Sequence, residues 1–201
     1  FISELVEQAA GLAAQSPEPV RGIGICVPGF LHDDLGSIAY NPNTPALVGY
    51  PLRRRIASAT NLPVAIEIDC NAAAMAEHRF GAGHAARRLL VLSLGTGVGV
   101  GMVVDGKPLR CTAGCCGDAG HVYVGGEARC SAGCQGCLES VISVDALRRA
   151  SGFEDIRELI DAARAGDARA GAVLRRAGER LGLASAGSTT VWLSPLPGTT
   201  T

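Results

Sequence analysis

One stretch of the sequence gathers most of the side chains that bind metal ions. Residues 114–140 read GCCGDAGHVYVGGEARCSAGCQGCLES and contain five cysteines, one histidine and three acids. A structural zinc site takes four thiolate or imidazole ligands, and the last two cysteines have the close CxxC spacing of such sites. The candidate zinc ligands are His121, Cys130, Cys134 and Cys137. We expect a cytoplasmic protein, in which clustered cysteines bind metal more often than they form disulfides.

A second candidate site is the glycine-rich turn GTGVGVG at residues 95–101, which follows the apolar run RLLVLSL. A tight turn of this kind exposes successive backbone N–H groups, and these suit phosphate oxygens. It is neither a Walker loop nor a dinucleotide fingerprint, because no Gly-Lys-Ser/Thr follows and the next element is a strand. The candidate phosphate-binding residues are Gly95, Thr96, Gly97 and Gly99. Glycine-rich hairpins without a ligand are also common, so the turn by itself leaves both interpretations open.

The third candidate is Asp69, at the junction between the apolar run LPVAIEID and the alanine-rich segment CNAAAMAEHRF. Ligands of open α/β sheets gather at the carboxyl ends of strands, and an acid there can accept a proton from a substrate hydroxyl. An acid just before a helix can equally serve as its N-cap. Local sequence does not decide between the two roles.

The elements that must position these residues alternate between strand and helix. Apolar runs rich in β-branched residues predict strands at 20–29, 62–69 and 88–94, and a further strand follows the glycine turn. Helices are predicted at 49–61 and 70–80 and from Leu138 to about residue 186. The pattern predicts an α/β fold. Residues 188–201 contain turn and β-type residues, and we expect them to form an atypical tail with no partner strand.

Composition limits the function classes. The chain has 201 residues and a formal net charge of −1, so no overall basic field points to nucleic acid. No apolar run reaches the roughly 20 residues of a membrane span, and the first residues lack the pattern of a signal peptide. We expect no membrane partner.

Several motifs, in order, resemble those of the ROK family, named for repressors, open reading frames and kinases. The resemblance covers about residues 1–186. IDCNAAAMAE is similar to the family's NDxNAAAxGE segment, and LSLGTGVGVG to its phosphate-side hairpin. GCCGDAGHVYV resembles GExGH, and CSAGCQGCLE resembles CxCGxxGCLE.

The resemblance implies an actin-like fold, in which two α/β lobes bind a sugar and Mg-ATP between them. Asp69 would be the base that deprotonates the attacking sugar hydroxyl, and zinc would be structural. The implied sugar-binding residues are Asn43, Asp118, His121 and Glu139. A homodimer is also implied. Residues 1–69 would belong to the first lobe, residues 70–187 to the second, and residues 188–201 to the atypical tail.

The chain also departs from the family pattern. Ile68 stands in place of Asn, Asp118 in place of Glu, and Ala132 in place of the middle zinc cysteine, for which we expect Cys134 to substitute. The family's DxGGT phosphate loop would precede residue 1, so we expect the chain to be a fragment that does not phosphorylate sugar alone. The alternative to an ATP-dependent hexose or N-acetylhexosamine kinase is the sugar-binding domain of a ROK repressor. That protein would bind DNA through an upstream helix-turn-helix.

Overall fold

The computed structural model describes residues 2–41, 44–110, 118–185 and 191–193, the last three as backbone only. The chain divides into two compact units. Unit 1 contains residues 1–72 and 110–116, and unit 2 contains residues 73–109 and 117–201. The implied sugar-binding residue Asn43 and the end of the tail lie outside the described residues.

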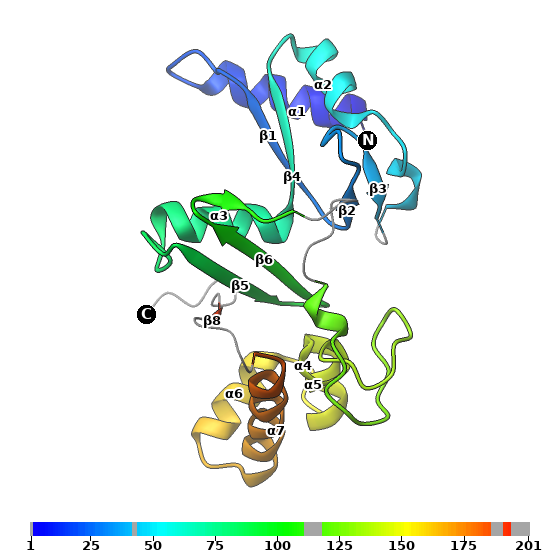
Figure 1. Cartoon of the computed structure of the whole chain (residues 1–201), viewed down its shortest axis with the longest axis vertical. Coiled ribbons are helices and arrows are strands. Elements are labelled where there is room, and N and C mark those ends of the chain that lie inside the picture. The colour runs from blue at the N-terminus through cyan, green and yellow to red at the C-terminus, as the bar shows by residue number, and fades with distance from the viewer. Residues whose placement is uncertain (1, 42–43, 111–117, 186–190, 194–201) are drawn as a thin grey trace. The chain divides into compact units, whose positions relative to one another are not determined.

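Unit 1 is built on a parallel pair of strands, β1 and β4 (Figure 1). Inward side chains of these strands belong to one apolar core. Helix α2 connects β3 to β4 and packs against β4, and helix α1 lies beside α2. The predicted strands at 20–29 and 62–69 and the predicted helix at 49–61 are confirmed. The elements of this unit are α1 (Ile2–Gln15), β1 (Ile23–Val27), β2 (Phe30–Leu31), β3 (Ile38–Tyr40), η1 (Pro45–Leu47), α2 (Leu52–Thr60) and β4 (Val64–Ile68).

Helix α3 (Asp69–Phe80) starts in unit 1, directly at the carboxyl end of β4, and continues into unit 2. The predicted helix at 70–80 is therefore confirmed, and Asp69 is its first residue. The strand ends here because the sequence changes from β-branched residues to the helix-favouring run NAAAMAE.

Unit 2 contains a four-stranded sheet in the order β7-β6-β5-β8 (Figure 1). Alternate residues of β5 face opposite sides. Leu92 packs with residues of α7, and Leu89 and Val91 pack with Ala74 of α3. The sheet thus has a helix on each face. Its elements are β5 (Arg88–Leu94), β6 (Val98–Val104), β7 (Lys107–Pro108), η3 (Ala119–His121), α4 (Glu139–Ile142), α5 (Val144–Ser151), α6 (Ile156–Arg164), α7 (Ala168–Ser185) and β8 (Val191–Leu193).

The expectation that the segment after the last helix has no partner strand is wrong. Strand β8 pairs in parallel with β5, with Leu90 opposite Val191 and Leu92 opposite Leu193. The pairing joins residues about a hundred positions apart, and it covers the edge of β5 that β6 leaves open. An unpaired strand edge exposes backbone N–H and C=O groups. A short segment of β-type residues that lies along this edge is therefore stabilised by hydrogen bonds to β5.

No helix among the described residues is long and apolar enough to span a membrane.

Candidate functional site

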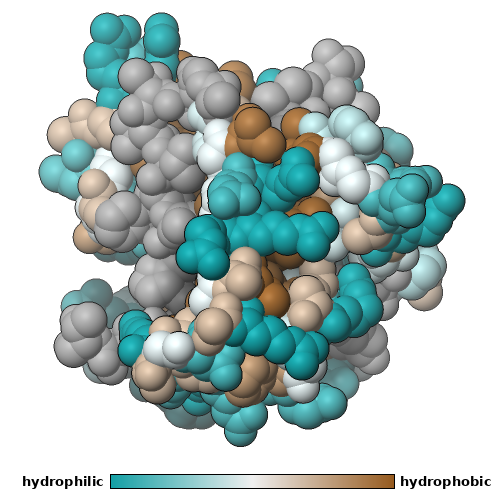
Figure 2. Space-filling view, turned by 90° about the horizontal axis from the view of Figure 1, so that it is seen from below, coloured by the Kyte–Doolittle hydropathy of each residue, from teal (hydrophilic) through white to brown (hydrophobic). Residues whose placement is uncertain are grey.

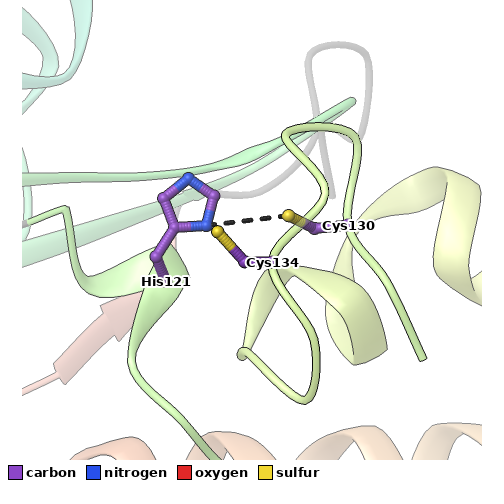
Figure 3. Close-up of side chains that lie close together, drawn as sticks. All are labelled: His121, Cys130 and Cys134. Carbon is purple, nitrogen blue, oxygen red and sulfur yellow. Dashed lines mark hydrogen bonds between the residues drawn. The ribbon is translucent and has the colours of Figure 1, made fainter. Parts of the chain in front are cut away.

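The predicted cysteine cluster forms a compact loop in unit 2 (Figure 3). The Cys130 N–H donates to the Cys134 carbonyl over 3.0 Å, and the Gly133 N–H donates to the Cys130 carbonyl over 3.0 Å. Gly133 and Gly136 have φ values of +86° and +67°, which side chains with a Cβ rarely adopt. These glycines bend the chain so that both thiols lie on the same side of the loop as His121.

Three of the four candidate zinc ligands lie together. One ligand atom from each of His121, Cys130 and Cys134 lies within 4.8 Å of the other two. The Cys130 Sγ lies 3.8 Å from the His121 Nδ1. A tetrahedral zinc ion with bonds of about 2.3 Å to sulfur and 2.0–2.1 Å to nitrogen would hold these atoms about 3.6 Å apart. The distance between Cys130 and His121 is close to this spacing, and the grouping of the three ligand atoms is compatible with a tetrahedral metal ion.

Cys134, which the sequence suggested as a substitute for the cysteine missing at position 132, belongs to this group of three. Cys137 is buried beside the group, with its Sγ 3.9 Å from the Cys134 carbonyl oxygen, but it is not part of the group of mutually close ligand atoms. Desolvation, together with the neighbouring Cys130, raises the pKa of the Cys134 and Cys137 thiols. Thiols in this setting favour the neutral form unless a cation compensates the thiolate charge.

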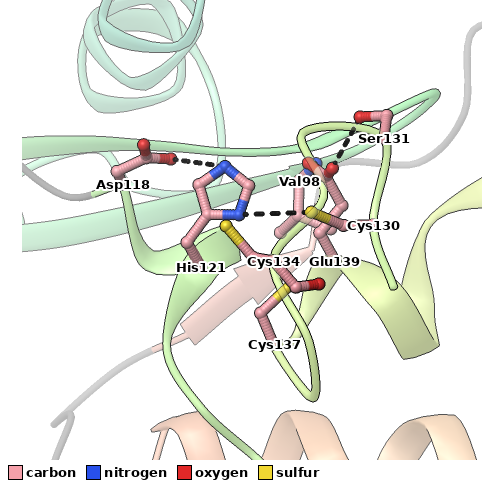
Figure 4. A network of polar contacts seen from close by, with 8 residues as sticks. All are labelled: Val98, Asp118, His121, Cys130, Ser131, Cys134, Cys137 and Glu139. Atoms are coloured by element: carbon pink, nitrogen blue, oxygen red, sulfur yellow. Dashed lines mark hydrogen bonds and ion pairs between the residues drawn. The ribbon is translucent and has the colours of Figure 1, made fainter. Parts of the chain in front are cut away.

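His121 connects the thiols to an acid (Figure 4). Its Nδ1 faces Cys130, and its Nε2 lies 3.8 Å from the Asp118 Oδ1. An acid beside the second ring nitrogen of a metal-binding histidine favours the tautomer in which the other nitrogen can bind the metal. The shorter side chain of Asp118, which stands where the family pattern has Glu, still reaches the edge of the imidazole ring.

Glu139 joins the cysteine loop to the glycine turn (Figure 4). The Glu139 residue is 7% exposed. One oxygen accepts a hydrogen bond from the Val98 N–H over 3.1 Å, and the other accepts one from the Ser131 hydroxyl over 2.9 Å. A carboxylate offers about four lone-pair positions, so both oxygens can still accept from a ligand. Ser131 was not predicted, because a serine inside a cysteine loop carries no signal of its own.

The glycine turn has the predicted form. It connects β5 to β6, and the Gly95 N–H donates to the Gly97 carbonyl over 2.9 Å. A Cβ on Gly97 would lie 2.9 Å from the Glu139 Oε2. The Glu139 carboxylate therefore approaches the backbone at position 97 so closely that a side chain there would have to displace it. Within the described residues, the N–H groups of Thr96 and Gly97 donate to no protein acceptor. Two adjacent free donors are available to an anion.

Asp69 lies in unit 1, exposed at the end of β4. Its Oδ1 accepts a hydrogen bond from the Cys70 N–H over 2.7 Å. This contact is with the next residue, whereas an N-cap bonds two or three residues ahead. Asp69 as a residue is exposed, and the geometry is compatible with a role as a base.

A polar group near Asp69 was not predicted from the sequence. Glu67, on β4, accepts hydrogen bonds from the Ile68 N–H over 3.0 Å and from the Asn71 side chain over 3.1 Å, and it forms an ion pair with Arg110. The Glu67 side chain is 17% exposed. The feature of the sequence that could have indicated Glu67 is the presence of an acid in the otherwise apolar strand VAIEI. These contacts fix the junction that carries Asp69.

Comparison with known proteins identifies the relatives of the chain. The family model described as "ROK family" matches residues 1–195. A xylose repressor from Caldicellulosiruptor bescii is 34% identical over 148 residues, which are 73% of this chain and 37% of that protein. A glucokinase from Halalkalibacterium halodurans is 36% identical over 137 residues, which are 67% of this chain and 41% of that protein. The chain thus spans about two fifths of these curated relatives.

The structure is similar to that of a ROK family glucokinase from Streptomyces griseus, solved in complex with glucose and AMPPNP. The TM-score is 0.74 at 27% sequence identity, and the match covers 92% of this chain and 67% of the glucokinase chain. The predicted α/β fold of the actin-like, ribonuclease H-like type is confirmed.

Proposed function

Because the chain belongs to the ROK family, we propose that the protein from which it comes is an ATP-dependent kinase of a hexose or an N-acetylhexosamine. The observation that carries this proposal is the position of Glu139, whose carboxylate contacts both the glycine turn and the cysteine loop. One buried side chain thereby connects a candidate phosphate-binding turn to a candidate sugar-binding surface. A phosphotransferase requires both functions side by side.

In the proposed reaction, Asp69 accepts the proton of the attacking sugar hydroxyl. The sugar oxygen forms a bond to the γ-phosphorus, and the bond from that phosphorus to the bridging oxygen breaks, which releases ADP. The free N–H groups of Thr96 and Gly97 donate to phosphate oxygens. Asp118, His121, Glu139 and the Asn43 segment bind sugar hydroxyls, because carboxylates accept and the imidazole can donate. Mg²⁺, bound with ATP, compensates part of the phosphate charge.

Zinc has a structural role in this proposal. His121, Cys130 and Cys134 would hold the ion, with Cys137 as the nearest additional thiol. The ion would fix the ring of His121 and the loop that carries Ser131, so that Glu139 and His121 are oriented before the sugar binds.

The kinase proposal is tested by sugar-dependent ADP release from the full-length protein, with glucose, N-acetylglucosamine and N-acetylmannosamine. We expect Asp69→Asn to lower kcat by a factor of about 10²–10⁴, because a general base contributes that much. Asp105→Asn is the matched control, since Asp105 is an exposed acid whose carboxylate pairs with the exposed Arg87. Unchanged turnover in Asp69→Asn would exclude Asp69 as the base.

The alternative function, the effector domain of a transcriptional repressor, is supported by the similarity to the xylose repressor. In that case the same surface would bind a sugar without transferring phosphate. Gel-shift assays of the full-length protein with operator DNA, with and without xylose, separate the two functions. Sugar-sensitive DNA binding without ADP release would favour the repressor, and sugar-dependent ADP release without DNA binding would favour the kinase.

A further inference from the structure

We propose that unit 2 contains a second anion-binding site, which takes a small molecule with several phosphate groups. The site is a hollow of about 550 Å³ between the cysteine loop and helices α4, α5 and α7. This volume lies in the usual range of small-molecule sites. The hollow is lined by four arginines, Arg129, Arg149, Arg169 and Arg176, and by no acidic residue.

The sequence of the two helices creates the hollow. On α7, Ala172 and Val173 lie one turn from both Arg169 and Arg176, so the four residues share a helix face. On α5, Ala146 and Ala150 lie one turn apart beside Arg149. Small side chains on both facing surfaces leave space where larger ones would fill the contact, and arginines surround that space. Figure 2 shows one face of the molecule, on which hydrophilic side chains lie around and between hydrophobic ones.

Three of the four arginines that line the hollow have no acidic partner among the residues that the structure describes. Within the described residues, Arg149, Arg169 and Arg176 form no ion pair, whereas the nearby Asp145 pairs with Arg148. Arg129 donates hydrogen bonds to the Gly133 carbonyl over 2.9 Å and to the Gln135 Oε1 over 3.4 Å, so it contributes charge to the hollow, while Arg149, Arg169 and Arg176 offer the less engaged guanidinium groups. Guanidinium groups bind phosphate through two parallel hydrogen bonds each. Several of them around an open hollow favour a ligand with several negative charges over a single anion.

The hollow is separate from the phosphate-binding turn of the proposed function. Neither Asp69 nor any residue of the 95–97 turn lines it. The inference therefore does not depend on kinase activity, and either proposal can fail while the other stands.

Calorimetric titration of the full-length protein with inorganic triphosphate at low salt tests the proposal. We expect binding that weakens at least about tenfold in the double variant Arg169→Gln, Arg176→Gln, since two bidentate contacts are lost. Arg175→Gln is the matched control, because Arg175 is an exposed arginine of the same helix that does not line the hollow. We expect its affinity to stay within about twofold of the original protein.

A third variant tests the hollow itself. Ala172→Leu fills the space without changing the charge or the helix propensity greatly, and it should weaken triphosphate binding as well. Thermal melts establish that each variant is folded. The proposal is overturned if the original protein does not bind triphosphate at about 1 mM. It is also overturned if Arg175→Gln weakens binding as much as the double variant, or if Ala172→Leu binds unchanged. Self-association abolished by the double variant, without triphosphate binding, would assign the hollow to a second copy and equally overturn the proposal.

Discussion

The carboxylate of Glu139 accepts a hydrogen bond from the backbone N–H of Val98 over 3.1 Å, although 41 positions separate the two residues. The bond is buried, and the other carboxylate oxygen accepts from Ser131. The glycine turn and the cysteine loop are therefore held in one arrangement by a single side chain. Any change at Glu139 is expected to affect both.

The first prediction concerns this contact. Glu139→Gln removes the charge from two hydrogen bonds, and bonds to charged groups contribute about 1.5–3 kcal/mol each. We expect the free energy of unfolding, measured in urea, to fall by about 1–3 kcal/mol. Glu127→Gln changes an exposed acid of the same loop, and we expect a change within about 0.5 kcal/mol. Equal effects of the two variants would show that the buried contact contributes no stability of its own.

The second prediction concerns the metal. We expect elemental analysis to find about one zinc ion per chain, and Cys134→Ser to remove most of it, because the chain has Ala132 at the family's middle cysteine position. Cys26→Ser is the control, since it removes an exposed thiol of unit 1. Full zinc content in Cys134→Ser would mean that Cys134 does not replace the missing ligand.

The third prediction concerns Cys70. Burial, together with the charge of Asp69, raises the pKa of the Cys70 thiol from 9.0 to about 12. In the unfolded chain the thiol ionises near its ordinary pKa, so between the two values the folded state holds more protons. The stabilisation is complete below about pH 9 and is lost as pH rises towards 12. The interval from pH 8 to pH 10.5 runs from about one unit below to about one and a half units above the unfolded pKa. Over this interval we expect the free energy of unfolding to fall less in Cys70→Ala than in the original protein.

Comparing each protein with itself at the two pH values cancels the constant cost of removing the Cys70 side chain. Cys26→Ala, which removes an exposed thiol, should retain the slope of the original protein. If Cys70→Ala and the original protein lose stability in parallel, the thiol is not protected from ionisation by the fold.

The fourth prediction concerns Glu67 as a positioning residue. Glu67→Gln weakens the ion pair with Arg110 and the contacts that fix the junction before Asp69. If the kinase proposal holds, we expect kcat to fall about tenfold while KM for the sugar changes little. A misplaced base weakens stabilisation of the transition state but not binding of the sugar. Glu77→Gln is the control, because Glu77 accepts a hydrogen bond at the far end of α3. A change in KM alone would assign Glu67 to sugar binding instead.

Much of the site could be predicted because its signals are local. The turn at 95–97 follows from alternating glycines between two β-branched runs, and Asp69 follows from a strand that changes abruptly into an alanine-rich helix. The tight cysteine loop depends in the same local way on Gly133 and Gly136, because only glycine adopts such positive φ values readily. Ser131 and Glu67 could not be predicted in this way. Their roles depend on contacts with Glu139 and Arg110, and no local sequence pattern indicates these contacts.

The sequence by itself determined the order of strands and helices, the family, and the residue types that gather at the candidate site. These features depend on the periodicity of apolar side chains and on backbone preferences, which act over a few residues. Only the tertiary structure decided which cysteine accompanies His121 and Cys130, that Glu139 reaches Val98, that β8 pairs with β5, and that four arginines surround one hollow. Each of these depends on which distant segments the packing of unit 2 brings together.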